Sequence, residues 1–177
     1  MSRVRAPIRS VISLLGLAAF RVRVSYSQHA RTAIAAGNTI VHANHVSLLD
    51  GVIVALASPA PLVFAVDTDF SRRSPIARFG FNVLSRIGFG TVVPLDRSAP
   101  FGMRALKRAL LSGANVMVFP EGGISVSGDR QPDKPGLSWL VAKTGASLVE
   151  VTIAGAEKSR LFARSGSEWW PKIFLTF

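Results

Sequence analysis

His45 and Asp50 are the residues whose types and spacing are best suited to chemistry, and they lie in the segment NHVSLLDG (residues 44–51). A carboxylate bonded to one imidazole nitrogen fixes the tautomer of the ring and leaves the other nitrogen free to accept a proton. That is the arrangement of a general base and its orienting group. A structural explanation uses the same residues, with Asp50 capping a helix and His45 as an ordinary loop histidine. From this segment alone, both explanations stay open.

The pair is expected at a junction between a strand and a helix. Residues 39–43 form a short apolar run that predicts a buried strand leading to His45. Ser47 followed by Asp50 resembles a capping box, so a helix is expected to start there with Asp50 in its first turn. Along one continuous helix, side chains five residues apart point about 140° apart. The turn at residues 46–47 must therefore fold the two side chains together if they form a pair.

Two other segments place polar residues at the ends of predicted strands. FPEGG (residues 119–123) follows a buried strand at 115–119, and its proline and two glycines predict a tight turn with exposed backbone amides. Ligands of α/β sheets commonly bind at such carboxyl ends. PLDR (residues 94–97) ends another strand, where Arg97 either receives an anionic headgroup or pairs with Asp96. An ordinary turn explains residues 119–123 equally well, so neither segment identifies a site alone.

The remaining pattern predicts one α/β domain with a mixed, mostly parallel sheet flanked by helices. Apolar strand-like runs alternate with helical patterns, and no linker rich in Gly, Ser or Pro divides the chain. A length of 177 residues suits one domain with a sizeable core. The further expected strands lie at residues 21–25, 62–66, 88–94, 147–153 and 173–177, and the expected helices at 74–86, 99–112 and 137–144.

The composition excludes several kinds of site. The chain has no cysteine, which excludes disulfides, thiolate zinc sites and a cysteine nucleophile. No metal site is expected. A hydrophobic fraction of 49% excludes a wholly disordered chain. The 21 Lys and Arg residues outnumber the 10 Asp and Glu residues, so the net charge of +11 favours an anionic partner, either nucleic acid or a membrane surface.

The N-terminal segment is the most basic part of the chain, because no acidic residue precedes Asp50. It contains an uncharged apolar run at residues 10–20 that would span about 16 Å as a helix, against about 30 Å for the hydrocarbon core of a bilayer. The run cannot cross a membrane alone. Three explanations remain: a helix packed on the core, a helix in the membrane interface, or a signal peptide without a cleavage site directly after it. We expect an interface helix in a region covering residues 1–24.

Taken in order, these segments resemble the glycerophospholipid acyltransferase family, which includes the lysophosphatidic acid acyltransferases. The first block of that family, His-x4-Asp, matches His45 and Asp50. The second block matches residues 94–97, the third block, Phe-Pro-Glu-Gly, matches 119–122, and the fourth corresponds to 148–151. The greatest likeness is to the acyltransferase domain of bifunctional acyl-carrier-protein synthetase/2-acylglycerophosphoethanolamine acyltransferases, and it is carried by residues 44–47, 50–52, 63–66, 142–143 and 155–157.

The resemblance implies direct acyl transfer by an acyltransferase domain at residues 25–177. His45, held by Asp50, takes the proton of a lysophospholipid hydroxyl, which attacks the thioester of acyl-coenzyme A or acyl-carrier protein. General-base catalysis of this kind contributes about 10²–10⁴-fold. No cofactor is implied besides that acyl co-substrate. The resemblance also implies that the acceptor and its phosphate are bound by Arg97, Glu121 and Gly122.

Two of the four blocks depart from the pattern of the family. The third block often continues as Gly-Thr-Arg, whereas this chain has Gly123 and Ile124 after Gly122. Glu150 stands where the fourth block usually has proline. Because one anion-binding arginine is missing, Gly123 and Lys134 are the candidates for further anion contacts.

The resemblance implies a peripheral membrane protein on the cytoplasmic face, with membrane lipids, a lysophospholipid and the acyl thioester as partners. The altered third block motivates an alternative, a catalytically weak or inactive lipid-binding member of the same family. A nucleic-acid-binding protein is disfavoured, because the chain lacks a recognised binding motif and a clustered face of aromatic and basic residues.

Overall fold

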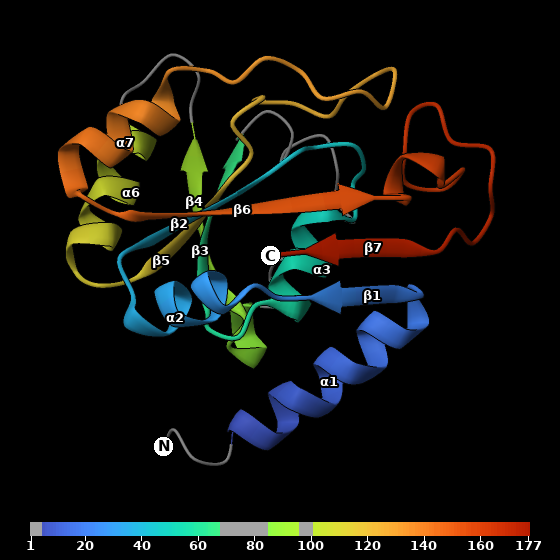
Figure 1. Ribbon diagram of the computed structural model, residues 1–177, viewed down its shortest axis with the longest axis horizontal. Helices are drawn as coiled ribbons and strands as arrows, with labels where there is room; N and C mark the ends of the chain where they lie inside the picture. The colour runs from blue at the N-terminus through green and yellow to red at the C-terminus, as the bar shows by residue number, and fades with distance from the viewer. Residues whose placement is uncertain (1–4, 68–84, 96–100) are drawn as a thin grey trace.

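A seven-stranded sheet organises the chain in a computed structural model that describes residues 5–67, 85–95 and 101–177 (Figure 1). Neighbouring strands pair in parallel, except for one antiparallel pair that includes the C-terminal strand. The predicted mixed, mostly parallel sheet is therefore confirmed. From one edge to the other the strands are β1 (Val22–Ser25), β7 (Ile173–Thr176), β6 (Ser147–Ala154), β2 (Thr39–Ala43), β5 (Asn115–Val118), β3 (Leu62–Asp67) and β4 (Gly90–Leu95), and β6 and β7 are the antiparallel pair.

The sheet separates two layers of helices and two apolar cores. Alternate side chains of a strand point to opposite faces, so Val41 and Ile40 of β2 belong to different cores. The core that contains Val41 also includes residues of three helices, and the core that contains Ile40 includes residues of two. The first three are α1 (Arg5–Ala19), α2 (Gln28–Ala36) and α3 (Asp50–Ala57), and the other two are α6 (Phe101–Leu111) and α7 (Gly136–Thr144).

The central position of β2 determines where the site forms. β2 pairs in parallel with β5 on one side and with β6 on the other. The carboxyl ends of parallel strands lie at the same edge of a sheet. The loop that follows β2 and the turn that follows β5 are therefore neighbours in space, although about 75 residues separate them in the sequence.

Helix α1 lies at the outer edge of the molecule, beside β1 (Figure 1). One side of it packs on the core through Ile12 and Leu17, and Gly16 lies so close to Leu56 that a β-carbon there would collide with that side chain. The core-packing explanation is thus right for this side, while the opposite side is exposed. Within the described ranges, no helix is long and apolar enough to cross a membrane.

Most of the predicted elements are confirmed, and their ends shift by a few residues. The strand predicted at 39–43 is β2, and the helix predicted at 137–144 is α7 with one more residue. The helix predicted from Ser74 lies mostly outside the described residues, which resume in helical conformation at residue 85. Helix α2 was not predicted.

Candidate active site

The side chains of His45 and Asp50 meet across the turn between them. His45 Nδ1 lies 2.9 Å from Asp50 Oδ2. His45 follows the end of β2, and Asp50 is the first residue of α3. The Asp50 side chain is fully buried, whereas the His45 side chain keeps 18% of its surface exposed. The contact occupies Nδ1, so Nε2 is the ring nitrogen left for a substrate proton.

The Asp50 carboxylate is held by its own loop as well as by the imidazole. Oδ2 accepts hydrogen bonds from the backbone N–H groups of Val46 at 2.7 Å and Ser47 at 2.8 Å. Oδ1 accepts one from the Ser47 hydroxyl at 2.8 Å. A buried carboxylate needs such donors to offset the loss of water. These bonds fix the position from which Asp50 orients the ring of His45.

The start of α3 corrects the predicted capping box. The N-cap is Leu49, whose side chain makes no capping bond, and the helix begins at Asp50. The hydroxyl of Ser47 accepts from the backbone N–H of Leu49 at 3.1 Å. Only the half of the box in which Asp50 binds the N–H of Ser47 is present. Asp50 therefore orders the loop and binds His45 at once, so the two explanations of this segment do not exclude each other.

Residues of the third block and of the segment directly after it contact both the ring and the backbone of His45. The ring of Phe119 stacks on the imidazole, with centroids 4.0 Å apart and planes 15° apart. The backbone N–H of His45 donates to Glu121 Oε1 at 3.0 Å, and its carbonyl accepts from the N–H of Ser125 at 2.8 Å. Together with Asp50, these contacts leave the imidazole little freedom to turn.

Both carboxylate oxygens of Glu121 bind backbone amides. Oε1 accepts from His45, and Oε2 accepts from the N–H of Gln131 at 3.1 Å. The side chain is buried, with 6% of the residue exposed. Glu121 thus joins the His45 loop to the segment at 131, and its predicted contribution to acceptor binding stays a prediction.

The turn after β5 brings Lys134 beside the predicted anion contacts. Gly122 has a φ of +70°, a left-handed conformation that favours glycine, and its N–H bonds to the carbonyl of Phe119 at 3.0 Å. A β-carbon at Gly122 would collide with the ammonium group of Lys134. Gly123 is exposed at the same turn. The structure therefore gathers Gly122, Gly123 and Lys134 near Glu121.

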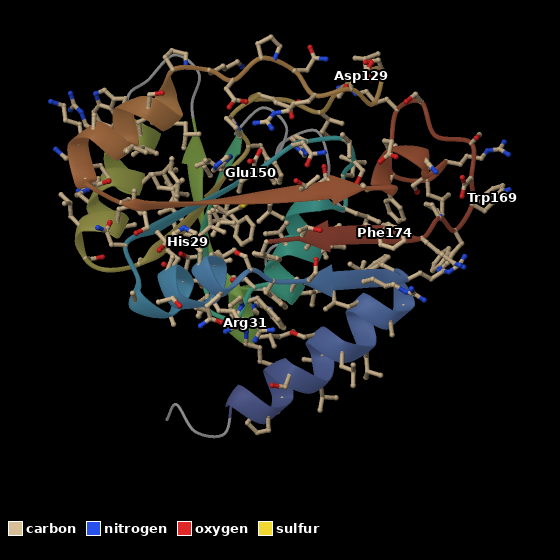
Figure 2. All side chains as sticks on the ribbon, in the orientation of Figure 1. His29, Arg31, Asp129, Glu150, Trp169 and Phe174 are labelled. Carbon is tan, nitrogen blue, oxygen red and sulfur yellow. The ribbon has the colours of Figure 1, made fainter. Side chains whose placement is uncertain are left out.

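The fourth block, residues 148–151, lies in β6, but the second block is described only as far as Leu95. β4 ends at Leu95, and Arg97 lies outside the described residues. Glu150 of β6 points outward (Figure 2) and accepts a hydrogen bond from Arg130 Nη1 at 2.7 Å. This bond raises the pKa of Arg130. No short-range pattern in the sequence signals an ion pair between residues so far apart.

The other two histidines have structural surroundings. His42 lies in β2, and burial lowers its pKa, with smaller opposing effects from Glu150 and Asp133. Its Nδ1 is buried with no hydrogen-bond partner within the part of the chain that the structure describes. His29 Nε2 lies 3.0 Å from the carbonyl oxygen of Leu148. Among the described residues, neither ring is paired with a carboxylate as His45 is.

Comparisons with known proteins show which family the chain belongs to. The model of the Acyltransferase family matches residues 21–154. The chloroplast proteins named 1-acyl-sn-glycerol-3-phosphate acyltransferase BAT2 of Brassica napus and LPAT1 of Arabidopsis thaliana are each 37% identical to this chain over 91 residues. That alignment covers 47% of this chain but only 26% of either relative.

A solved structure shares the fold. The crystal structure of the 1-acyl-sn-glycerophosphate (LPA) acyltransferase PlsC from Thermotoga maritima superimposes with a TM-score of 0.65 and 24% identity. The match covers 97% of this chain and 68% of that one. Since the family model spans the histidine–aspartate pair and the turn at 119–123, the chain belongs to the Acyltransferase family.

Proposed function

We propose that this chain is a membrane-associated O-acyltransferase that moves a fatty acyl group from an acyl thioester to the free hydroxyl of a lysophospholipid. The contact of 2.9 Å between His45 and Asp50, in a chain of this family, is the observation that carries the proposal. The acceptor class is 1-acylglycerol-3-phosphate or acylglycerophosphoethanolamine, and the names of the two plant relatives support the former.

The chemistry is general-base catalysis by His45. Asp50 accepts a hydrogen bond from Nδ1–H of His45. The lone pair is therefore on Nε2, which takes the proton of the acceptor hydroxyl as its oxygen attacks the thioester carbonyl. The tetrahedral intermediate collapses as the carbon–sulfur bond breaks. The leaving thiolate takes the proton from the imidazolium, which Asp50 has stabilised. One ester bond forms and one thioester bond breaks, with no acyl-enzyme.

The acceptor phosphate lies beside the turn at residues 121–123 in this proposal. The ammonium of Lys134 is adjacent to Gly122 and supplies a positive charge there. Arg97 of the second block is the other predicted contact. A phosphate bound by these groups places the free hydroxyl of the acceptor near the ring of His45, which stacks on Phe119.

Association with the membrane occurs through the exposed side of α1. Its apolar residues include Leu14, which is 70% exposed, and the helix contains two arginines and no acidic residue. A basic-flanked apolar helix face suits the interface of an anionic membrane. The donor is acyl-coenzyme A or acyl-carrier protein on the cytoplasmic side.

A transfer assay tests the proposal. Purified protein is incubated with radiolabelled acyl-coenzyme A or acyl-carrier protein and a panel of lysophospholipids, with His45→Ala as the control. We expect labelled diacyl product from the wild-type protein with lysophosphatidic acid and lysophosphatidylethanolamine at comparable rates. Vesicle binding without transfer from any donor would instead support the inactive lipid-binding alternative.

A further inference from the structure

Two tryptophans form an exposed surface on the loop between η1 (Ala156–Lys158) and β7. Trp169 is 61% exposed and Trp170 is 50% exposed. Figure 2 shows Trp169 at the outer edge of the molecule. The guanidinium of Arg160 lies over the Trp169 ring, 4.7 Å from its centroid. We call Trp169, Trp170 and the neighbouring exposed Leu161 the tryptophan surface.

This surface is attached to the end of α1. The indole N–H of Trp170 donates to the carbonyl of Ala19 at 3.0 Å, and the guanidinium of Arg21 donates to the carbonyl of Trp170 at 2.7 Å. The tryptophan surface is therefore fixed where α1 ends. The outer side of α1 adds four exposed apolar side chains, those of Ile8, Val11, Leu14 and Leu15.

The charges around the tryptophan surface are mainly positive. Residues 156–172 carry four basic and two acidic side chains. Arg21 and Arg23, both exposed, add two more positive charges at the adjoining end of α1. Indole rings favour the boundary between water and hydrocarbon, and basic residues favour an anionic lipid surface. The combination fits an anionic membrane.

The same loop holds the catalytic segment. The backbone N–H of Leu48 donates to the carbonyl of Phe162 at 2.9 Å, and Ser47 and Ala163 form an isolated antiparallel bridge. Ser47 is in turn bonded to the Asp50 carboxylate. A membrane that binds this loop lies close to the site, which is where a lipid acceptor must enter.

We infer that Trp169 and Trp170 insert into the headgroup region of an anionic membrane and form a second attachment point beside α1. The inference rests on the membrane association proposed above. With α1 alone, the protein could rotate about the helix axis. The second attachment point removes that rotation and holds the loop of His45 towards the lipid.

Tryptophan fluorescence tests the insertion directly, because the chain has three tryptophans and Trp139 is on α7, in the other helical layer. Full-length variants that keep one tryptophan each, with phenylalanine at the other two positions, are mixed with phosphatidylcholine–phosphatidylglycerol vesicles. We expect a blue shift and quenching by chain-brominated lipid for Trp169 and for Trp170. We expect neither for Trp139, which is partly exposed and serves as the matched control.

A binding experiment measures the contribution of the surface. Trp169→Ser removes no hydrogen bond to α1, so it is the variant that keeps the fold, and Trp170→Ser is measured beside it. Each should lower the vesicle partition coefficient by about tenfold, given the apolar area of an indole ring. Trp139→Phe should leave the coefficient unchanged. Trp169→Ser should also leave unchanged the rate of transfer to a short-chain, monomeric acceptor, because that acceptor does not have to be taken from a membrane.

The outcomes separate the proposals. Vesicle binding by the wild-type protein without quenching of Trp169 or Trp170 would overturn this inference and leave α1 as the attachment. No binding of the wild-type protein to vesicles would overturn both membrane proposals. Insertion of the tryptophans in a protein that transfers no acyl group would retain this inference and overturn the acyltransferase activity.

Discussion

The carboxylate of Glu121 binds the backbone N–H of His45, at 3.0 Å, and not its imidazole ring. The third block therefore positions the proposed base through the main chain. The ring itself is oriented by Asp50 on its edge and by Phe119 on its face. The proposed base is thus held by two different blocks of the sequence.

Glu121→Gln should lower kcat by about 10- to 100-fold with little change in the KM for the acceptor, because a small displacement of a base is costly. The glutamine NH₂ group would face one of the two N–H donors that the carboxylate now accepts. Stability should fall by about 1.5–3 kcal/mol. Steady-state kinetics and urea unfolding measure both effects.

Glu150→Gln is the matched control for this change. Its carboxylate is exposed and pairs with Arg130, so the loss of stability should be within about 1 kcal/mol and kcat should not change. A raised acceptor KM with unchanged kcat in Glu121→Gln would show that Glu121 contacts the acceptor.

His45→Ala should reduce acyl transfer by about 10²–10⁴-fold, since it removes the proposed base. The histidine is partly exposed, and the Asp50 carboxylate keeps its three loop donors. The free energy of unfolding should therefore fall by only about 1 kcal/mol. Unchanged turnover in a folded variant would refute the mechanism.

Asp50→Asn should affect both activity and stability. The amide oxygen can take the place of Oδ2, and the NH₂ group then faces the Ser47 hydroxyl, which must turn to accept. The lost charge weakens these bonds, so stability should fall by about 1–3 kcal/mol. Turnover should fall by at least about 100-fold, because a neutral amide does not stabilise the imidazolium of His45. Kinetics below the melting temperature of the variant separate the effects. If only the melting temperature falls, Asp50 serves the loop alone.

Lys134→Met should raise the KM for a phosphate-bearing acceptor several-fold and leave the KM for the acyl donor unchanged. Methionine keeps much of the apolar side chain and removes the charge beside Gly122. Lys143→Met, an exposed change on α7, is the control. Equal KM values in both variants would show that Lys134 does not meet the phosphate.

Acid should destabilise the protein through His42. Burial lowers the pKa of His42 in the folded state, so the unfolded chain binds the proton more readily. The free energy of unfolding therefore falls as the pH drops below about 6.5, the ordinary pKa of histidine. His42→Val should reduce the difference between urea midpoints at pH 7.5 and pH 5.5 (roughly one pH unit on each side of that value). His29→Ala, at an exposed position of α2, is the control.

Local pattern was sufficient for much of the fold. The apolar run at 39–43 predicted β2, whereas the meeting of His45 with Asp50 was expected only once the ordered blocks resembled a family. Helix α2 was missed because its buried residues are mostly small, namely Ala30 and Ala33 with Ile34, and it relies on Ser27 capping the N–H of Ala30.

The remaining contacts of the site depend on the tertiary fold. The bond from Gln131 to Glu121 uses only a backbone amide, so the side chain at 131 gives no signal of it. The pair of Arg130 with Glu150 joins a loop to β6 across 20 residues. Such contacts follow from strand order, which periodicity does not determine.

Because Glu121 binds main-chain atoms at residues 45 and 131, the side chains between Ile124 and Asp133 are not needed for that connection. This segment lies beside the proposed acceptor site, yet its sequence can vary while the base stays in place. A library of variants there, with Glu121, Ser125 and residues 119–123 kept, offers a route to enzymes with altered headgroup selectivity. Variation of this kind would leave the contact between His45 and Asp50 unchanged.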